Sequence, residues 1–275
     1  MMLIDKILSI LFPVLNHWGY WIILIFLVIS ILLIQIFCTI QQKRHIFTRY
    51  HLYALIINIC SLYLLSKMIE DVIDKESIIL LDIWINTKVV LLWNPILDKV
   101  MILITDIIRP FHLFLLTIIL LGFLIYKKRW YYSLLLTFSM IGGLLFKVLL
   151  KWVIFRARPE NALIGATGYS FPSGHATMAM IFFSLVLISC KEEITNNALR
   201  YLFIAGNITL ILMIGLSRVY LNVHWLSDVI AGFALGLFWV TLLILVFRTT
   251  ITLSTKTLNK IKKTISNKLN FNITL

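Results

Sequence analysis

Charged residues are scarce in this chain of 275 residues: Asp, Glu, Lys and Arg make up 13% of it, whereas hydrophobic residues make up 61%. A soluble domain carries about 25% charged residues. The shortage excludes a soluble globular domain, and the abundance of apolar residues excludes a disordered chain. The composition instead predicts a membrane protein that crosses the bilayer several times.

Cysteine is also rare, and the three cysteines, Cys38, Cys60 and Cys190, all lie in apolar runs. Their spacing excludes a disulfide-stapled secreted module and a CxxC metal motif, so we interpret them as buried thiols. No carboxylate cluster with metal-ligand spacing lies near the polar motifs described below. We therefore expect neither a metal ion nor another cofactor.

Apolar runs long enough to cross a bilayer recur along the chain. They predict an all-α fold, a polytopic membrane helical bundle of seven spans. The expected spans are roughly His17–Ile40, His51–Ile69, Pro110–Tyr126, Trp130–Leu150, Ala176–Cys190, Tyr201–Leu216 and Trp225–Phe247.

Residues 70–109 interrupt this pattern with carboxylates. A membrane-spanning helix would not tolerate so many acids, but apolar pairs still recur between them. We expect amphipathic helices that lie on the membrane surface. The acids are Glu70, Asp71, Asp74, Glu76, Asp82, Asp98 and Asp106.

Basic residues without acids fill three segments, at 43–49, 127–129 and 248–268. All three fall on one side of the membrane if seven spans alternate, and that side is cytoplasmic by the positive-inside rule. We therefore expect a bacterial inner-membrane protein whose opposite face is periplasmic. The basic tail is expected to bind anionic lipid rather than nucleic acid.

Polar residues gather at three places that this topology puts on the periplasmic face. The last of them holds His224 and Asp228, four residues apart. On a helix they would share one face, so that Asp228 accepts a hydrogen bond from one imidazole nitrogen and leaves the other free to attack. The alternative is an ion pair that merely caps a span.

The middle motif is Pro172-Ser173-Gly174-His175, which reads as the start of a helix. Ser173 would be the N-cap, and Gly174 would let an anion approach the free N–H groups. His175 would lie in the first turn, where it can donate a proton to a leaving oxygen. An ordinary turn before a span would have the same four residues.

The first motif supplies cations: Lys151, Arg156 and Arg158. The planar guanidinium of an arginine suits phosphoryl oxygens. We interpret Arg156 differently, as a side chain that snorkels at the bilayer edge. Arg218 is a further guanidinium, just before the last motif.

Joined, these groups form a phosphoryl-transfer site. The cations and the helix N-terminus would neutralise the transition state, His224 would attack phosphorus, and His175 would protonate the leaving group. Lysine and arginine would then supply the charge that a divalent metal supplies elsewhere.

The pattern Lys151-x6-Arg158-Pro159, then Pro172-Ser173-Gly174-His175, then Ser217-Arg218-x5-His224-x3-Asp228 resembles the three-part signature of the type-2 phosphatidic acid phosphatase superfamily. The resemblance implies a phosphohistidine at His224, oriented by Asp228, with His175 as general acid. It implies that Lys151, Arg158, Ser173, Gly174 and Arg218 hold the phosphate. Arg156 lies outside the signature.

The resemblance also implies a core of six spans and an activity on phosphate monoesters. Residues 51–247 would be this core, 1–50 an additional span with its cytoplasmic loop, and 248–275 a cytoplasmic tail. The short segment between Pro159 and Pro172 leaves the site open toward the membrane, which favours a lipid phosphate. Candidates are phosphatidylglycerophosphate, phosphatidate, undecaprenyl diphosphate and lipid A phosphates. A lipid phosphotransferase and a non-catalytic transporter or scaffold are the alternatives, and the oligomeric state stays open.

Overall fold

The structure is a computed structural model that describes residues 49–75 and 77–247. The predicted first span and the basic tail lie outside these residues. Within them the regular elements are helices, which confirms the all-α fold class. They are α2 (Arg49–Ile73), α3 (Ser77–Val90), α4 (Pro95–Asp106), α5 (Pro110–Tyr126), α6 (Trp130–Ile154), α7 (Gly174–Cys190), the short 3₁₀ helix η1 (Lys191–Glu193), α8 (Asn197–Tyr220) and a final helix (Leu226–Phe247).

Five of these helices are long and apolar enough to cross a membrane by themselves: α2, α6, α7, α8 and the final helix. The pair α4 and α5 forms a sixth candidate, bent by 47° between its two halves. The bend falls at Pro110, the first residue of α5, whose ring restricts the preceding residue to extended backbone. Five of the six spans predicted between residues 51 and 247 correspond to single helices. The predicted span Pro110–Tyr126 is a candidate only together with α4, which was expected to lie on the membrane surface.

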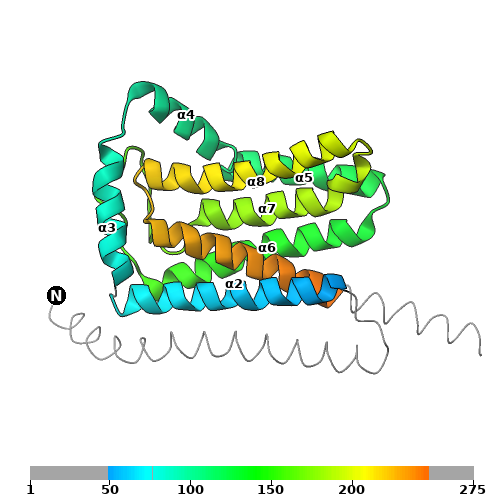
Figure 1. Cartoon of the computed structure of the whole chain (residues 1–275), viewed down its shortest axis with the longest axis horizontal. Helices are drawn as coiled ribbons and strands as arrows, with labels where there is room; N and C mark the ends of the chain where they lie inside the picture. Colours follow the sequence, from blue (N-terminus) through cyan, green and yellow to red (C-terminus); the bar gives the residue numbers. More distant parts are fainter. Residues whose placement is uncertain (1–48, 76, 248–275) are drawn as a thin grey trace, which may run out of the picture.

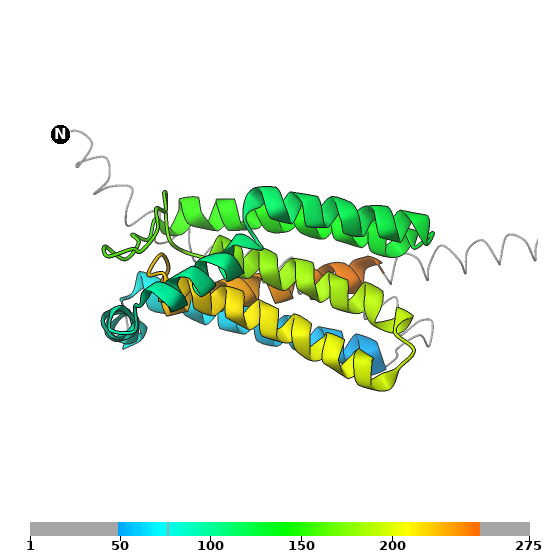
Figure 2. The ribbon, with the colours of Figure 1, turned by 90° about the horizontal axis from the view of Figure 1, so that it is seen from above.

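The spanning helices form a bundle whose members run roughly along one direction, and α3 lies across their ends (Figure 1). Seen from above, α3 is viewed end-on and α4 folds back along α8 (Figure 2). Large apolar side chains on the outer faces are exposed, as expected of helices that face lipid. The bundle interior is packed with aliphatic residues, including Leu135, Leu136, Ile181 and Ile214.

Two glycines bring the final helix against the start of α7. A Cβ at Gly232 would stand 2.7 Å from the carbonyl oxygen of Ser173, and one at Gly236 would stand 2.8 Å from that of Thr177. Small residues at this four-residue spacing let helix backbones approach closely in membranes. The contact holds the N-terminus of α7 beside the N-terminus of the final helix, where the predicted site residues lie.

Gly232→Ala is expected to destabilise the protein by about 1–3 kcal/mol, because the added methyl group overpacks a backbone contact. Thermal unfolding in detergent measures the effect. Gly122→Ala in α5 is the matched control, since a Cβ there would have no neighbour within 4 Å. Equal unfolding temperatures for the two variants would contradict this account of the contact.

Candidate active site

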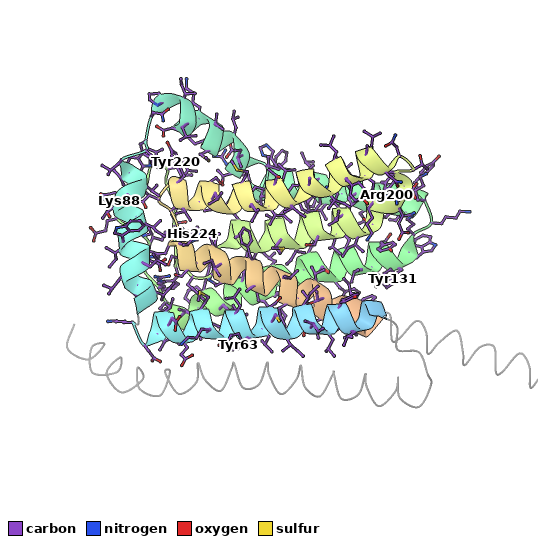
Figure 3. All side chains as sticks on the ribbon, in the orientation of Figure 1. Tyr63, Lys88, Tyr131, Arg200, Tyr220 and His224 are labelled. Carbon is purple, nitrogen blue, oxygen red and sulfur yellow. The ribbon has the colours of Figure 1, made fainter. Side chains whose placement is uncertain are left out.

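The predicted site residues meet at one end of the bundle. His224 lies at the end that α3 crosses, the end that also carries Tyr220 and Lys88, while Tyr131 and Arg200 mark the opposite end (Figure 3). The ion pairs of Glu193 with Lys127 and Arg129 belong to that opposite end. The basic segment 127–129 is therefore far from the site, as the predicted topology requires.

A tight turn between α8 and the final helix presents His224. Asn222 has φ of 55°, the left-handed conformation that asparagine tolerates better than most residues. The backbone N–H groups of Val223 and His224 both donate to the carbonyl of Arg218, which closes the turn. His224 thus precedes the final helix, so the prediction that it shares a helix face with Asp228 is wrong.

The pairing that this spacing predicted is nevertheless present. Nδ1 of His224 lies 3.3 Å from Oδ2 of Asp228, and both side chains are buried. Arg158 approaches the other ring nitrogen, with Nη1 3.2 Å from Nε2. A guanidinium only donates, so Nε2 is the acceptor and the proton belongs on Nδ1, facing the carboxylate. This tautomer leaves the lone pair of Nε2 directed toward the cations.

Burial lowers the pKa of His224 well below its ordinary value of 6.5, because a buried imidazole loses the hydration that stabilises its charged form. The positive charges of Arg158, Arg218 and Lys151 lower this pKa further. The ring is therefore neutral at physiological pH and holds the lone pair that nucleophilic attack needs.

The last turn of α6 and the loop after it hold two of the predicted cations, Lys151 and Arg158. Phe155, with φ of 51°, ends α6 and turns the chain toward the site. Lys151 donates to the carbonyls of Tyr169 and Ser170. Arg158 donates from Nε to the Gly168 carbonyl at 2.9 Å. Backbone carbonyls of residues 168–170 thus fix the direction of both side chains without neutralising their charge.

The start of α7 carries Ser173, Gly174 and His175, as predicted. Ser173 occupies the N-cap position, but its hydroxyl makes no capping hydrogen bond, contrary to the expectation. In the described part of the chain, Oγ of Ser173 and Nε of Arg218 are buried and have no hydrogen-bond partner. His175 lies close enough to Arg218, Lys147 and Arg158 for their positive charges to act on it.

The interpretation of Arg156 as a snorkelling residue is wrong. Its side chain is 10% exposed and binds two carboxylates, Asp228 at 2.7 Å and Asp82 at 2.6 Å. Asp82 was expected on a surface-lying helix among water-facing acids, yet its side chain is fully buried. The sequence held one signal for this role, because Arg156 and Arg158 are two residues apart in an extended segment and can reach neighbouring groups.

Lys147 is a further cation, which lies within the predicted span Trp130–Leu150 and outside the three motifs. It lies one helical turn before Lys151, on the same face of α6. Its Nζ is 3.3 Å from the position that a Cβ would take on Gly174, so its charge adjoins the N-terminus of α7. Positive charge beside the positive end of a helix dipole is unfavourable unless an anion binds between them. The i to i+4 spacing of the two lysines could have indicated this position.

Thr105 of α4 also contacts a site residue, and no motif in the sequence indicated this contact. Its Oγ1 accepts a hydrogen bond of 2.7 Å from Nη1 of Arg218. The contact ties the bent α4–α5 pair to the site and orients the guanidinium so that its Nε is left without a partner.

Histidines, cysteines and carboxylates do not form a group that could hold a metal ion anywhere in residues 49–75 and 77–247. The charged groups of the site are instead the cations Lys147, Lys151, Arg158 and Arg218, together with the carboxylate of Asp228 and its partner Arg156. The arrangement can bind an oxyanion and present a neutral imidazole to it.

Comparison with known proteins agrees with this chemistry. The PAP2 superfamily profile matches residues 132–251. Phosphatidylglycerophosphatase B of Bacillus subtilis is 35% identical over 182 residues, which cover 64% of this chain and 88% of that protein. An undecaprenyl-diphosphatase of Sulfolobus acidocaldarius is 31% identical over 127 residues, covering 44% and 57%.

A solved structure is similar as well. The crystal structure of a transmembrane PAP2-type phosphatidylglycerolphosphate phosphatase from Bacillus subtilis superposes with a TM-score of 0.61. The two chains are 28% identical, and the match covers 69% of this chain and 93% of the other. The present chain therefore belongs to the PAP2 superfamily. It is an integral membrane phosphoric monoester hydrolase that acts on lipid phosphates.

The titration of His224 tests the electrostatics of the site. Nitrogen NMR of histidine-labelled protein should find the ring neutral, with its proton on Nδ1, as the pH falls through 6.5. Arg158→Gln should raise the pKa of His224 without restoring the ordinary value, because burial is the larger cause. Arg129→Gln, at the opposite end, is the control. A wild-type ring that titrates near pH 6.5, or one that Arg158→Gln does not shift, would refute the assignment.

Proposed function

We propose that the protein hydrolyses phosphatidylglycerophosphate through a phosphohistidine at His224, without a metal ion. The observation that carries the proposal is the buried ring of His224, whose Nδ1 faces Asp228 while Nε2 faces a cluster of cations. Asp228 would hold the tautomer and stabilise the positive charge that develops on the ring during attack.

Each chemical step would have a group to carry it out. Nε2 of His224 attacks phosphorus while the bond to the lipid oxygen breaks, and His175 gives its proton to that oxygen. Water then attacks the phosphohistidine as His175 takes a proton from it, which releases inorganic phosphate and the neutral His224. Arg158 first has to exchange its hydrogen bond to Nε2 for one to a phosphate oxygen, so substrate binding would itself free the nucleophile.

Phosphate recognition would fall to the groups that the resemblance implied. Oγ of Ser173 and Nε of Arg218 are buried donors that need an acceptor. The backbone N–H of Gly174, the first residue of α7, would add a further donor. Lys151 and Arg158 would add charge, which supports binding and transition-state stabilisation without a divalent ion.

The substrate assignment is supported by the sequence similarity to a phosphatidylglycerophosphatase, which extends over 182 residues. The short segment between Pro159 and Pro172 supports a head group that reaches the site while its acyl chains stay in the bilayer. Phosphatidate, undecaprenyl diphosphate and lipid A phosphates would share the phosphate chemistry but differ in the group beyond it.

The orientation in the membrane is part of the same proposal. The basic segment 127–129 lies at the end opposite His224, which supports a periplasmic site and a cytoplasmic tail at 248–275. Residues 1–50 would then be an additional span with its loop, outside the phosphatase core at 51–247.

Phosphate release by the full-length protein in detergent tests the function. We expect release from phosphatidylglycerophosphate in the presence of EDTA, and at least a 1,000-fold lower rate for His224→Ala, on the order expected for loss of a nucleophile. The three other lipid phosphates are assayed in parallel. A second lipid in the mixture that acquires the phosphate would indicate a phosphotransferase instead.

The mechanism would be wrong if His224→Ala kept its activity or if EDTA abolished release. Release from another lipid alone would overturn only the substrate assignment. His112→Ala is the matched control, because this histidine is exposed on α5.

Ser173→Ala tests phosphate binding. Loss of a hydrogen bond to a charged group costs about 1.5–3 kcal/mol, so kcat/KM should fall about 10- to 100-fold. Ser189→Ala is the control, since Ser189 is a buried serine of the same helix that bonds the Leu185 carbonyl near its other end. Equal kinetics for the two variants would remove Ser173 from the phosphate site.

A further inference from the structure

Asp82 comes from α3, the helix that crosses the ends of the bundle, yet its carboxylate lies against the catalytic turn. Oδ1 accepts a hydrogen bond of 3.0 Å from the backbone N–H of Ser227, in the first turn of the final helix. Oδ2 accepts from the Ser227 hydroxyl and from Nη2 of Arg156. Asp82 is thus bound to the element that begins directly after His224.

Arg156 completes the connection. Its Nη1 donates to Oδ1 of Asp228 at 2.7 Å and to the Ser227 hydroxyl at 2.6 Å, while Nη2 binds Asp82. The guanidinium also stacks on Trp225, 5.4 Å from the ring centroid. One planar group therefore joins two buried carboxylates and the residue next to His224.

The two oxygens of Asp228 are divided between these partners. Oδ1 binds Arg156, and Oδ2 accepts from the backbone N–H of Trp225 and faces Nδ1 of His224. The carboxylate cannot rotate without breaking one of these bonds. Its orientation toward the imidazole is consequently set by Arg156 on one oxygen and by the Trp225 N–H on the other.

Stability alone does not explain the arrangement. Buried ion pairs contribute little net stability, because desolvation offsets their attraction. The cluster of Asp82, Asp228 and Arg156 carries a net charge of −1. A single negative charge therefore acts on the ring of His224. Burial and the nearby cations lower the pKa of His224, and a negative charge beside the ring acts against them.

We propose that Asp82 and Arg156 are positioning residues, which orient Asp228 and set the negative charge that it presents to His224. The inference rests on the proposed role of His224 as nucleophile. It makes α3 part of the catalytic apparatus, although no residue of α3 belongs to the three sequence motifs.

Charge balance gives the inference a distinctive test. Asp82→Asn leaves the cluster neutral and should move the acidic limb of the kcat/KM profile to lower pH, since His224 then holds its proton less firmly. Arg156→Gln leaves a charge of −2 and should move the limb to higher pH. The double variant restores −1 and should return the limb toward its wild-type position.

The other charges around His224 are the same in all these proteins and do not produce the differences. They are Arg158 from the loop after α6, Lys151 from α6, Arg218 from α8, and His175 from α7.

The experiment measures phosphate release from phosphatidylglycerophosphate micelles by full-length protein, from pH 8 down to the lowest pH at which each protein stays folded. Each single variant should lose about 10- to 100-fold in kcat, the usual effect of removing a group that orients a reacting side chain, with KM nearly unchanged. Asp71→Asn is the control, because Asp71 is a buried acid of α2 that pairs with Lys67, 2.8 Å away.

Opposite shifts that cancel in the double variant would support the inference. Shifts in one direction, or none, would refute it, as would an equal loss of activity in Asp71→Asn. If Arg156→Gln fails to fold, the single shift of Asp82→Asn and the position of the double variant still decide. Retained activity in His224→Ala would instead refute the proposed function.

Discussion

A carboxylate buried at the end of a membrane bundle is costly unless its oxygens are all bonded, and the site depends on how Asp228 meets this condition. Arg156 supplies one partner, and the turn that carries His224 supplies the others. Burying the acid therefore fixes the imidazole tautomer, the start of the final helix and the placement of α3 together. The hydrogen bonds of Asp228 therefore both hold the helices together and orient His224.

Among the described residues, the remaining cations of the site form no ion pair with a carboxylate like the one between Arg156 and Asp228. Asp228 is already paired with Arg156, whereas Lys151 and Arg158 are held by neutral carbonyls. Lys147 adjoins the positive end of α7. This surplus of positive charge, enclosed by apolar helices, favours an oxyanion over a neutral ligand. It also lowers the pKa of His224, which keeps Nε2 unprotonated.

Much of this could be predicted from the sequence, because membrane spans and short motifs are local signals. The six spans of the described region and the pairing of His224 with Asp228 were found in this way. The role of Arg156 was missed, because its partner Asp82 is 74 residues away and only the tertiary fold brings them together. Asp82 was expected to face water for the same reason. The spacing of residues within a motif cannot show that a carboxylate from a distant helix pairs with one of them.

The glycine contact between α7 and the final helix has a consequence for how such an enzyme diversifies. His175 and His224 are each anchored at the start of one of these helices, and their backbones touch at Gly232. The distance between the two histidines is therefore set by the main chain. Most substitutions of nearby side chains should leave it unchanged. Residues of α4 and of the segment before Pro172 can then change while the spacing of the two histidines stays constant. One catalytic frame can in this way serve lipids that have little in common beyond their phosphate.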